Sequence, residues 1–204
     1  LYPELLELNG FIDSIQQQCG QKITALENQK VTLSIEKEIP TPCHVIVDKQ
    51  SLIHIVTKLI DNAIKFTLDG DVTVLFNLLP DGSLTIVVND TGIGISQQSK
   101  KNIFDTFRQA DEQHTRKFGG TGLGLSIAKG LLDLLNGSIE FHSEPGKGST
   151  FSVSIPMVVK EAILENGQGI NQWKGKTILI VGKAARENKT LNKVLHKSKA
   201  ILKY

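Results

Sequence analysis

The chain of 204 residues carries a formal net charge of +2, with 40% hydrophobic and 22% charged residues. This balance is typical of a globular domain and excludes an extensively disordered chain. Lysine and arginine are spread along the sequence, so no basic patch indicates binding to nucleic acid. No run of about 18 apolar residues is present, so no membrane-spanning helix is predicted.

The first residues do not form a secretory signal, and the chain is expected to be a piece of a longer protein. Residues 4–28 carry apolar side chains at steps of three or four, which predicts an amphipathic helix that docks on another surface, for example a partner helix. Its Cys19 and the later Cys43 lack metal-ligand spacing, so two idle thiols in a reducing compartment are expected.

Alternating apolar residues predict a strand over 31–39 and a short strand over 45–47. Asp48 is the expected N-cap of a helix that continues to about Thr67. One face of this helix is apolar and the other presents a line of polar side chains, which indicates that only one face packs on a core.

Two further strands are predicted over 72–79 and 83–89, joined by a Pro-Asp-Gly turn. Residues 91–121 lose periodicity, which is typical of a functional or mobile loop. A helix over 122–136 follows and is expected to stop at Gly137. Its predicted apolar face consists of Leu123, Ile127, Leu131 and Leu134.

Strands over 138–142 and 149–155 complete a final hairpin. This order predicts an α/β (α+β) fold, a two-layer α/β sandwich with one mixed sheet and helices on one face. It excludes a doubly wound parallel sheet. A linker over 158–175, a buried strand over 176–181 and a helix over 186–197 are expected to follow.

Four segments carry residues suited to binding a nucleotide. In the first, Asn62 and Lys65 share a helical face, where an amide oxygen can bind Mg²⁺ and a lysine can meet a phosphate. In the second, Asp90 ends a strand and can accept a hydrogen bond from an amine, while Gly92 and Gly94 allow close approach to a flat ring. A solvated helix face and a plain glycine turn are the respective alternatives.

The third segment, Gly119 to Gly124, opens a helix, where bare N–H groups favour a phosphate. No strand leads directly into it and it lacks a Gly-Lys-Ser/Thr ending, so neither a dinucleotide site nor a P-loop fits. The fourth is the preceding loop. Its Phe104 and Phe107 can anchor it, and its basic residues can meet phosphates or serve as ordinary surface charge. These basic residues are Arg108, Arg116 and Lys117.

In this order and spacing, the segments resemble the asparagine, first glycine, phenylalanine and second glycine boxes of sensor histidine kinases. These kinases belong to the GHKL superfamily, whose Bergerat fold has a mixed five-stranded sheet and three helices. The resemblance covers about residues 1–157 and includes a last box at 146–151. The sequences at 62–66 and 116–126 are specific to the kinase branch of the superfamily.

The resemblance implies an ATP site in which Asn62 coordinates Mg²⁺ and Asp90 holds the adenine amine. It also implies that Thr150 supports Asp90 from the neighbouring strand. The glycines would line the base and cradle the phosphates, and the basic residues would contact phosphates. The implied ATP-binding residues are Asn62, Lys65, Phe66, Asp90, Gly92, Gly94, Arg108, Arg116, Lys117, Gly120, Thr121, Gly122, Leu123, Gly124 and Thr150. No catalytic residue is implied within the chain.

The resemblance further implies a protein histidine kinase of two-component signal transduction. Residues 29–157 would deliver the γ-phosphoryl of ATP to a histidine on an upstream dimeric helical domain, whose end and connector would be residues 1–28. A receiver domain or response regulator would be the second partner. The domain would be cytoplasmic, in a parent anchored in the inner membrane, and would itself contact neither membrane nor nucleic acid.

The sequence departs from the family pattern at several points. Lys58 stands where asparagine is usual, so its charge is expected to aid phosphate binding or to compete with Mg²⁺. None of the five histidines has a phosphoacceptor context, so this chain alone is expected not to autophosphorylate. Residues 176–204 resemble a truncated, degenerate receiver, with Gly182 and Lys183 in place of its acidic residues. An unrelated extension that packs on the kinase domain is the alternative.

Two rival functions remain open. A non-catalytic module that binds nucleotide or only a partner is motivated by Lys58 and by the degenerate tail. A GHKL ATPase that uses ATP as a conformational switch is the other. Its gyrase-type members resemble one another in a glutamate base at the position of Lys58, which this chain lacks.

Overall fold

The computed structural model describes residues 1–24, 30–105, 122–160, 177–179 and 201–203. The chain divides into two compact units, Leu1–Val159 and Lys160–Tyr204, and each is described by itself. Within the described residues, no helix combines the length and the apolar character needed to cross a membrane.

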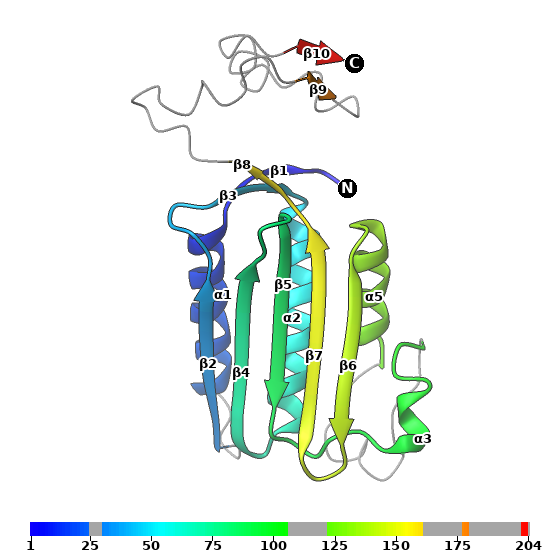
Figure 1. Ribbon diagram of the computed structural model, residues 1–204. Coiled ribbons are helices and arrows are strands. Elements are labelled where there is room, and N and C mark those ends of the chain that lie inside the picture. Colours follow the sequence, from blue (N-terminus) through cyan, green and yellow to red (C-terminus); the bar gives the residue numbers. More distant parts are fainter. Residues whose placement is uncertain (25–29, 106–121, 161–176, 180–200, 204) are drawn as a thin grey trace. The chain divides into compact units, whose positions relative to one another are not determined.

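The first unit is built on a mixed five-stranded sheet (Figure 1). Only the β2–β4 pair is parallel, and the other three pairs are antiparallel. In spatial order the strands are β2 (Lys30–Glu38), β4 (Asp69–Leu78), β5 (Ser83–Asp90), β7 (Gly148–Pro156) and β6 (Ser138–Glu144). These strands agree with the segments predicted from alternating hydrophobicity.

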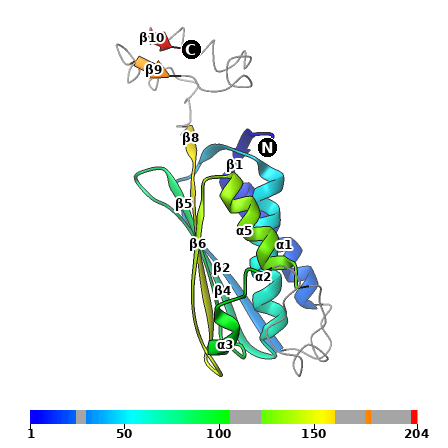
Figure 2. The same ribbon diagram turned by 90° about the vertical axis from the view of Figure 1, so that its right-hand side faces the viewer.

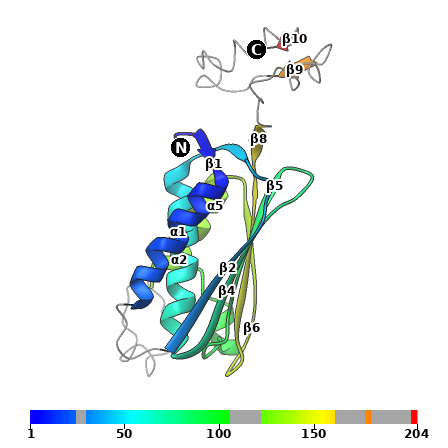
Figure 3. The same ribbon diagram turned by 90° about the vertical axis from the view of Figure 1, so that its left-hand side faces the viewer.

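Three helices cover one face of this sheet. Figures 2 and 3 view the sheet along its edge, with all three helices on the same side. They are α1 (Leu8–Thr24), α2 (Lys49–Phe66) and α5 (Gly124–Leu134), and a short helix, α3 (Gln97–Lys100), lies at one end of the sheet. The predicted two-layer α/β sandwich is confirmed.

The core fills the space between the two layers. Alternate residues of β4 and β5 are buried, among them Val74, Phe76 and Ile86, each 0% exposed. They pack with the apolar face of α2, including Leu52 and Ile55. Burial of one such side chain contributes about 1.5–3 kcal/mol, so this layer of contacts is a large stabilising contribution.

The start of α2 is fixed as the sequence predicted. The Asp48 carboxylate accepts the N–H of Ser51 at 2.8 Å and the N–H of Tyr2 at 2.5 Å. These bonds lower the pKa of Asp48. They also join α2 to the first residues of the chain, because one carboxylate serves both segments.

The N-terminal segment differs from its prediction. Residues Glu4–Glu7 form β1, which pairs antiparallel with β3 (His44–Val47) in a small sheet that also contains β8 (Val158–Lys160). The helix therefore begins at Leu8, and β8 occupies the start of the expected linker. A local apolar repeat does not reveal that Glu4–Glu7, the first residues of the predicted helix, pair with a strand about forty residues away.

The apolar face of α1 is covered inside the same unit. Its buried side chains join the core formed by α2 and the sheet. They are Leu8, Phe11, Ile12, Ile15 and Cys19. The predicted boundary near residue 28 is therefore not a boundary between compact units. Cys19 and Cys43 are both buried free thiols, and burial raises the pKa of each.

The buried face of α5 also differs from its prediction. Ala128 and Leu132 are 0% exposed, whereas Ile127 and Leu134 of the predicted face are 43% and 61% exposed. Apolar residues surround most of this helix, so spacing alone selects no single face. After α5, Asn136 takes the left-handed conformation (φ 55°) and Gly137 donates to the Leu132 carbonyl, which ends the helix.

In the second unit, β9 (Thr177–Leu179) pairs in parallel with β10 (Ile201–Lys203). β9 lies inside the strand predicted over 176–181. The helix predicted over 186–197 lies outside the described residues.

Candidate nucleotide-binding site

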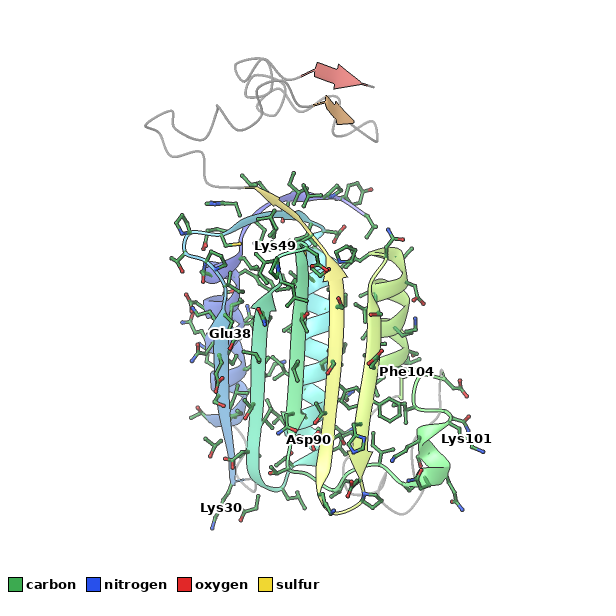
Figure 4. All side chains as sticks on the ribbon, viewed as in Figure 1. Lys30, Glu38, Lys49, Asp90, Lys101 and Phe104 are labelled. Atoms are coloured by element: carbon green, nitrogen blue, oxygen red, sulfur yellow. The ribbon has the colours of Figure 1, made fainter. Side chains whose placement is uncertain are left out.

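Asp90 is a buried carboxylate at the end of β5 (Figure 4). It is 6% exposed, and its Oδ1 accepts the N–H groups of Gly92 at 2.9 Å and Ser149 at 3.3 Å. Burial raises the pKa of Asp90, and these two hydrogen bonds oppose part of the rise. No lysine, arginine or histidine among the described residues forms an ion pair with it. An unpaired buried acid is costly, which indicates a functional site.

Gly92 and Gly94 are required by close contacts within the chain. A Cβ on Gly92 would lie 2.3 Å from the Phe66 carbonyl oxygen. A Cβ on Gly94, whose φ is +69°, would lie 2.1 Å from the Glu144 carbonyl oxygen. These contacts brace the loop after Asp90 against α2 and the β6–β7 turn. These contacts within the chain explain why glycine stands at both positions, without the expected contact with a base.

The start of α5 lies beside the polar face of α2. A Cβ on Gly124 would lie 3.7 Å from Asn62 Nδ2 and 3.8 Å from both Asn62 Oδ1 and Lys58 Cδ. The structure thus brings the predicted asparagine and second glycine segments together. Leu123 caps α5 without a side-chain hydrogen bond, and Gly122 precedes it with φ +69°. The Leu123 side chain therefore does not occupy the first N–H groups of α5.

Lys65 and Phe66 lie at the end of α2. The Lys65 ammonium nitrogen is 4.8 Å from the centroid of the Phe66 ring, a cation–π distance. Partial burial lowers the pKa of Lys65. Lys58, Asn62 and Lys65 follow one another at steps of four and three residues, so they share one face of α2.

Phe104 anchors the described part of the loop. Its ring meets Phe141 of β6 edge to face, with 5.9 Å between ring centroids, and Phe141 stacks on Phe151 of β7 at 5.7 Å. The expectation that Phe104 fixes this loop to the core is confirmed.

Thr150 does not support Asp90, and this expectation is corrected. Thr150 pairs with Asn89, and its hydroxyl donates to Asn89 Oδ1 at 2.8 Å on the face without helices. Asp90 instead faces Ser149, whose backbone N–H binds the carboxylate. Ser149 lies one position before the predicted Thr150, and neighbouring residues of a strand point to opposite faces, so only Ser149 shares the face of Asp90.

Five predicted site residues lie outside the described part of the chain. They are Arg108, Arg116, Lys117, Gly120 and Thr121. Phe107 lies in the same range. Among the described residues, no three His, Cys, Asp or Glu side chains are grouped to hold a metal. The Asn62 amide oxygen is a ligand of the kind that suits a magnesium ion.

Comparison with known proteins agrees with this geometry. Residues 47–159, more than half of the chain, match the family described as histidine kinase-, DNA gyrase B-, and HSP90-like ATPase. The matched range contains α2, the Asp90 strand, α5 and the final hairpin.

Curated relatives include sensor kinases. Over 132 residues the chain is 44% identical to the autoinducer 2 sensor kinase/phosphatase LuxQ of Vibrio vulnificus, covering 62% of this chain and 15% of LuxQ. Over 156 residues it is 36% identical to the signal transduction histidine-protein kinase BarA of Escherichia coli, covering 74% of this chain and 17% of BarA. The chain thus spans less than a fifth of the length of either relative.

Solved structures share the fold. Full-length ShkA in complex with AMPPNP matches with a TM-score of 0.66 and 22% identity, covering 99% of this chain and 40% of that chain. The nucleotide-free catalytic domain of the histidine kinase ThkA matches with a TM-score of 0.62 and 23% identity, covering 76% of this chain and 96% of that chain. The predicted Bergerat fold is confirmed.

Proposed function

Because this chain belongs to the family of histidine kinase-, DNA gyrase B-, and HSP90-like ATPases, we propose that it binds magnesium-ATP as the catalytic domain of a sensor histidine kinase. The γ-phosphoryl of ATP goes to a histidine on a helical domain elsewhere in the parent protein. The similarity to two sensor kinases, LuxQ and BarA, supports this assignment.

The observation that carries the proposal is the buried Asp90 carboxylate without an ion-pair partner in the described chain. Its Oδ1 is held by two backbone N–H groups, and no donor within the described residues binds Oδ2, which can therefore accept from a ligand. The exocyclic amine of adenine is a donor that suits this oxygen. A hydrogen bond to a charged acceptor contributes about 1.5–3 kcal/mol, enough to select the base.

The polyphosphate binds where α5 begins beside Asn62 and Lys58. Lys65 and Arg116 contact phosphate oxygens, and the segment from Gly120 to Gly124 offers N–H groups. Asn62 gives its amide oxygen to Mg²⁺, which neutralises charge on the phosphates when it is bound. Catalysis by this chain consists of positioning and charge neutralisation, because the accepting histidine lies elsewhere.

In the intact protein, the partners are a histidine-bearing dimeric helical domain and a receiver domain or response regulator. Residues 176–204 form a degenerate receiver-like segment, an assignment that the parallel β9–β10 pair supports. The domain lies in the cytoplasm, in a parent anchored in the inner membrane.

Two measurements test the proposal. Calorimetric titration of the 204-residue chain with ATP and Mg²⁺ should give saturable binding. Incubation with γ-labelled ATP should leave this chain unlabelled and label a supplied histidine-bearing helical domain. Absence of nucleotide binding at millimolar ATP would exclude the proposal, and label on the chain itself would contradict the expectation that it carries no phosphoacceptor histidine.

Lys58 favours one second candidate, a nucleotide-binding module without kinase activity. Its side chain runs beside Gly124, so its charge lies close to the proposed metal and phosphate site. The Lys58→Asn variant should change the dependence of ATP affinity on Mg²⁺ by up to about tenfold, since Lys58 either assists the phosphates or competes with the metal. Titration with and without Mg²⁺ measures this. If ATP affinity depends on Mg²⁺ identically in wild type and Lys58→Asn, the Lys58 charge does not act on the metal and phosphate site.

Phosphotransfer separates the two candidates. If the wild-type chain binds ATP but labels no helical domain, and Lys58→Asn restores labelling, the wild-type chain is the non-catalytic module. If the wild-type chain labels the helical domain, it is the kinase. Asp61→Asn, a neighbour of Asn62 that pairs with Lys22 at 2.7 Å, is a control for altered charge on the same helix.

A further inference from the structure

Three buried polar side chains form a row across neighbouring strands at the Asp90 end of the sheet. Asp90 of β5 faces Ser149 of β7, and Ser149 faces Ser143 of β6. Their exposed fractions are 6%, 8% and 1%. Because opposed residues of neighbouring strands point to the same face, all three lie on the helix side of the sheet.

The Ser143 hydroxyl uses its full bonding capacity. Its oxygen accepts the N–H of Ile95 at 2.8 Å, donates to the Gly148 carbonyl oxygen at 3.0 Å and lies 3.0 Å from the Ser149 hydroxyl. A hydroxyl has one hydrogen and a carbonyl oxygen can only accept, so the Ser149 hydroxyl donates to Ser143. Ser149 Oγ is left with lone pairs alone.

Ser143 therefore joins the two backbone segments that hold Asp90. Ile95 belongs to the loop that begins with Gly92, and Gly92 gives Asp90 Oδ1 its first N–H. Ser149 gives the second N–H from β7. Removal of the Ser143 hydroxyl would leave buried backbone groups without this partner and would loosen both segments at once.

We propose that Ser143 is the positioning residue that sets the base specificity of this site, through the hydrogen bonds that aim Asp90. The inference rests on the proposed ATP binding. With the Ser149 hydrogen committed to Ser143, Asp90 and Ser149 present only acceptors. The site then selects a purine whose edge donates a hydrogen bond, as the 6-amino group of adenine does.

The test compares ATP with purine riboside triphosphate, which has the same shape but lacks the 6-amino group. Affinities of both nucleotides for the full chain are measured by calorimetry in the presence of Mg²⁺. Wild type should bind ATP at least about tenfold more tightly than the analogue, the effect of one hydrogen bond to a charged acceptor. In Ser143→Ala this ratio should fall to about threefold or less, through a loss of ATP affinity.

Two further variants separate positioning from packing. Ser143→Cys keeps the branching of the side chain with a slightly larger atom and weakens its hydrogen bonds, so it should lower the ratio even if Ser143→Ala fails to fold. Ser152→Ala changes a serine of β7 on the face without helices and should leave both affinities unchanged. Thermal unfolding of each variant shows that it is folded at the temperature of the titration.

The outcomes are distinct. A reduced ATP-to-analogue ratio in a folded Ser143 variant supports the inference. An unchanged ratio overturns it, whether both affinities fall by the same factor or neither falls, because Ser143 then acts on packing alone. If wild type binds neither nucleotide, the proposed function fails instead.

Discussion

Two rows of side chains cross the same three strands one residue apart, and they differ in almost every respect. Asp90, Ser149 and Ser143 lie on the helix side and are buried. Asn89, Thr150 and His142 lie on the other side, where Asn89 and His142 are exposed. The two rows share the same strands but differ in residue type, and only the first row, which contains the buried acid Asp90, is covered by the helix layer.

The difference shows what the second layer adds. On the buried row, backbone N–H groups and hydroxyls are committed to one another and to Asp90. On the open row, the exposed Thr150–Asn89 hydrogen bond of 2.8 Å competes with water, so it contributes little to the stability of the fold. Substitutions in the buried row and in the loop that contacts it should therefore have larger effects than substitutions in the open row.

The largest expected effect is on stability, at Gly94. Alanine there must adopt φ +69° and place a Cβ 2.1 Å from the Glu144 carbonyl oxygen. The free energy of unfolding should fall by about 3–5 kcal/mol, from backbone strain plus the clash. Chemical denaturation measures the loss.

Gly146 is the matched control for Gly94. Its φ is +75°, but a Cβ there would meet nothing within 4 Å. Gly146→Ala should therefore cost only about 1–2 kcal/mol, the strain alone. Equal losses at the two positions would show that the contact between Gly94 and the β6–β7 turn is unimportant.

The second effect is on nucleotide binding, at Asp90. Asp90→Asn should weaken ATP binding by about 10- to 100-fold, because the carboxylate acceptor is lost while Oδ1 keeps its backbone bonds. Asn89→Ala, which changes the neighbouring residue of the open row, should bind ATP as wild type does. Calorimetry on both variants makes the comparison. Equal affinities for Asp90→Asn and wild type would remove Asp90 from the site.

The third effect is a pH dependence of stability in the nucleotide-free protein. The pKa of Asp90 is raised above its ordinary value of 3.8, so the folded state holds this proton more tightly than the unfolded chain does. The free energy of unfolding due to Asp90 should therefore rise as the pH falls through the raised pKa toward 3.8. The difference between wild type and Asp90→Asn isolates this contribution. A difference that is flat or slopes the other way would contradict the raised pKa.

The smallest effect is expected at Thr150. Thr150→Val removes the hydrogen bond to Asn89, yet it should change the free energy of unfolding by no more than about 0.5 kcal/mol and leave ATP affinity unaltered. Parallel denaturation and calorimetry would show this. An affinity loss as large as that of Asp90→Asn would return Thr150 to the site.

Much of the fold was accessible from the sequence because its signals are local. Alternating apolar residues placed the strands of the main sheet, and Asp48 marked the start of α2. The missed features depend on distant pairing. Nothing local shows that β1 pairs with β3, or that α5 buries Leu132 in preference to Ile127.

The site was predictable in outline for a similar reason. Asn62, Asp90 and Gly124 stand in recognisable segments, and the structure brings Asn62 and Gly124 together. The partner of Asp90 was misplaced by one residue, because the strand register decides which side chain points inward. Ser143 carried no signal of its own, since a lone serine in a strand looks like any surface residue.

The shared hydrogen bonds of Asp48 have a mechanical consequence. The Asp48 carboxylate binds the backbone of Tyr2 and the first turn of α2. The strand that follows Tyr2, β1, pairs with β3, which ends just before Asp48. A displacement of the first residues of the chain is therefore transmitted directly to α2, whose C-terminal half carries Asn62.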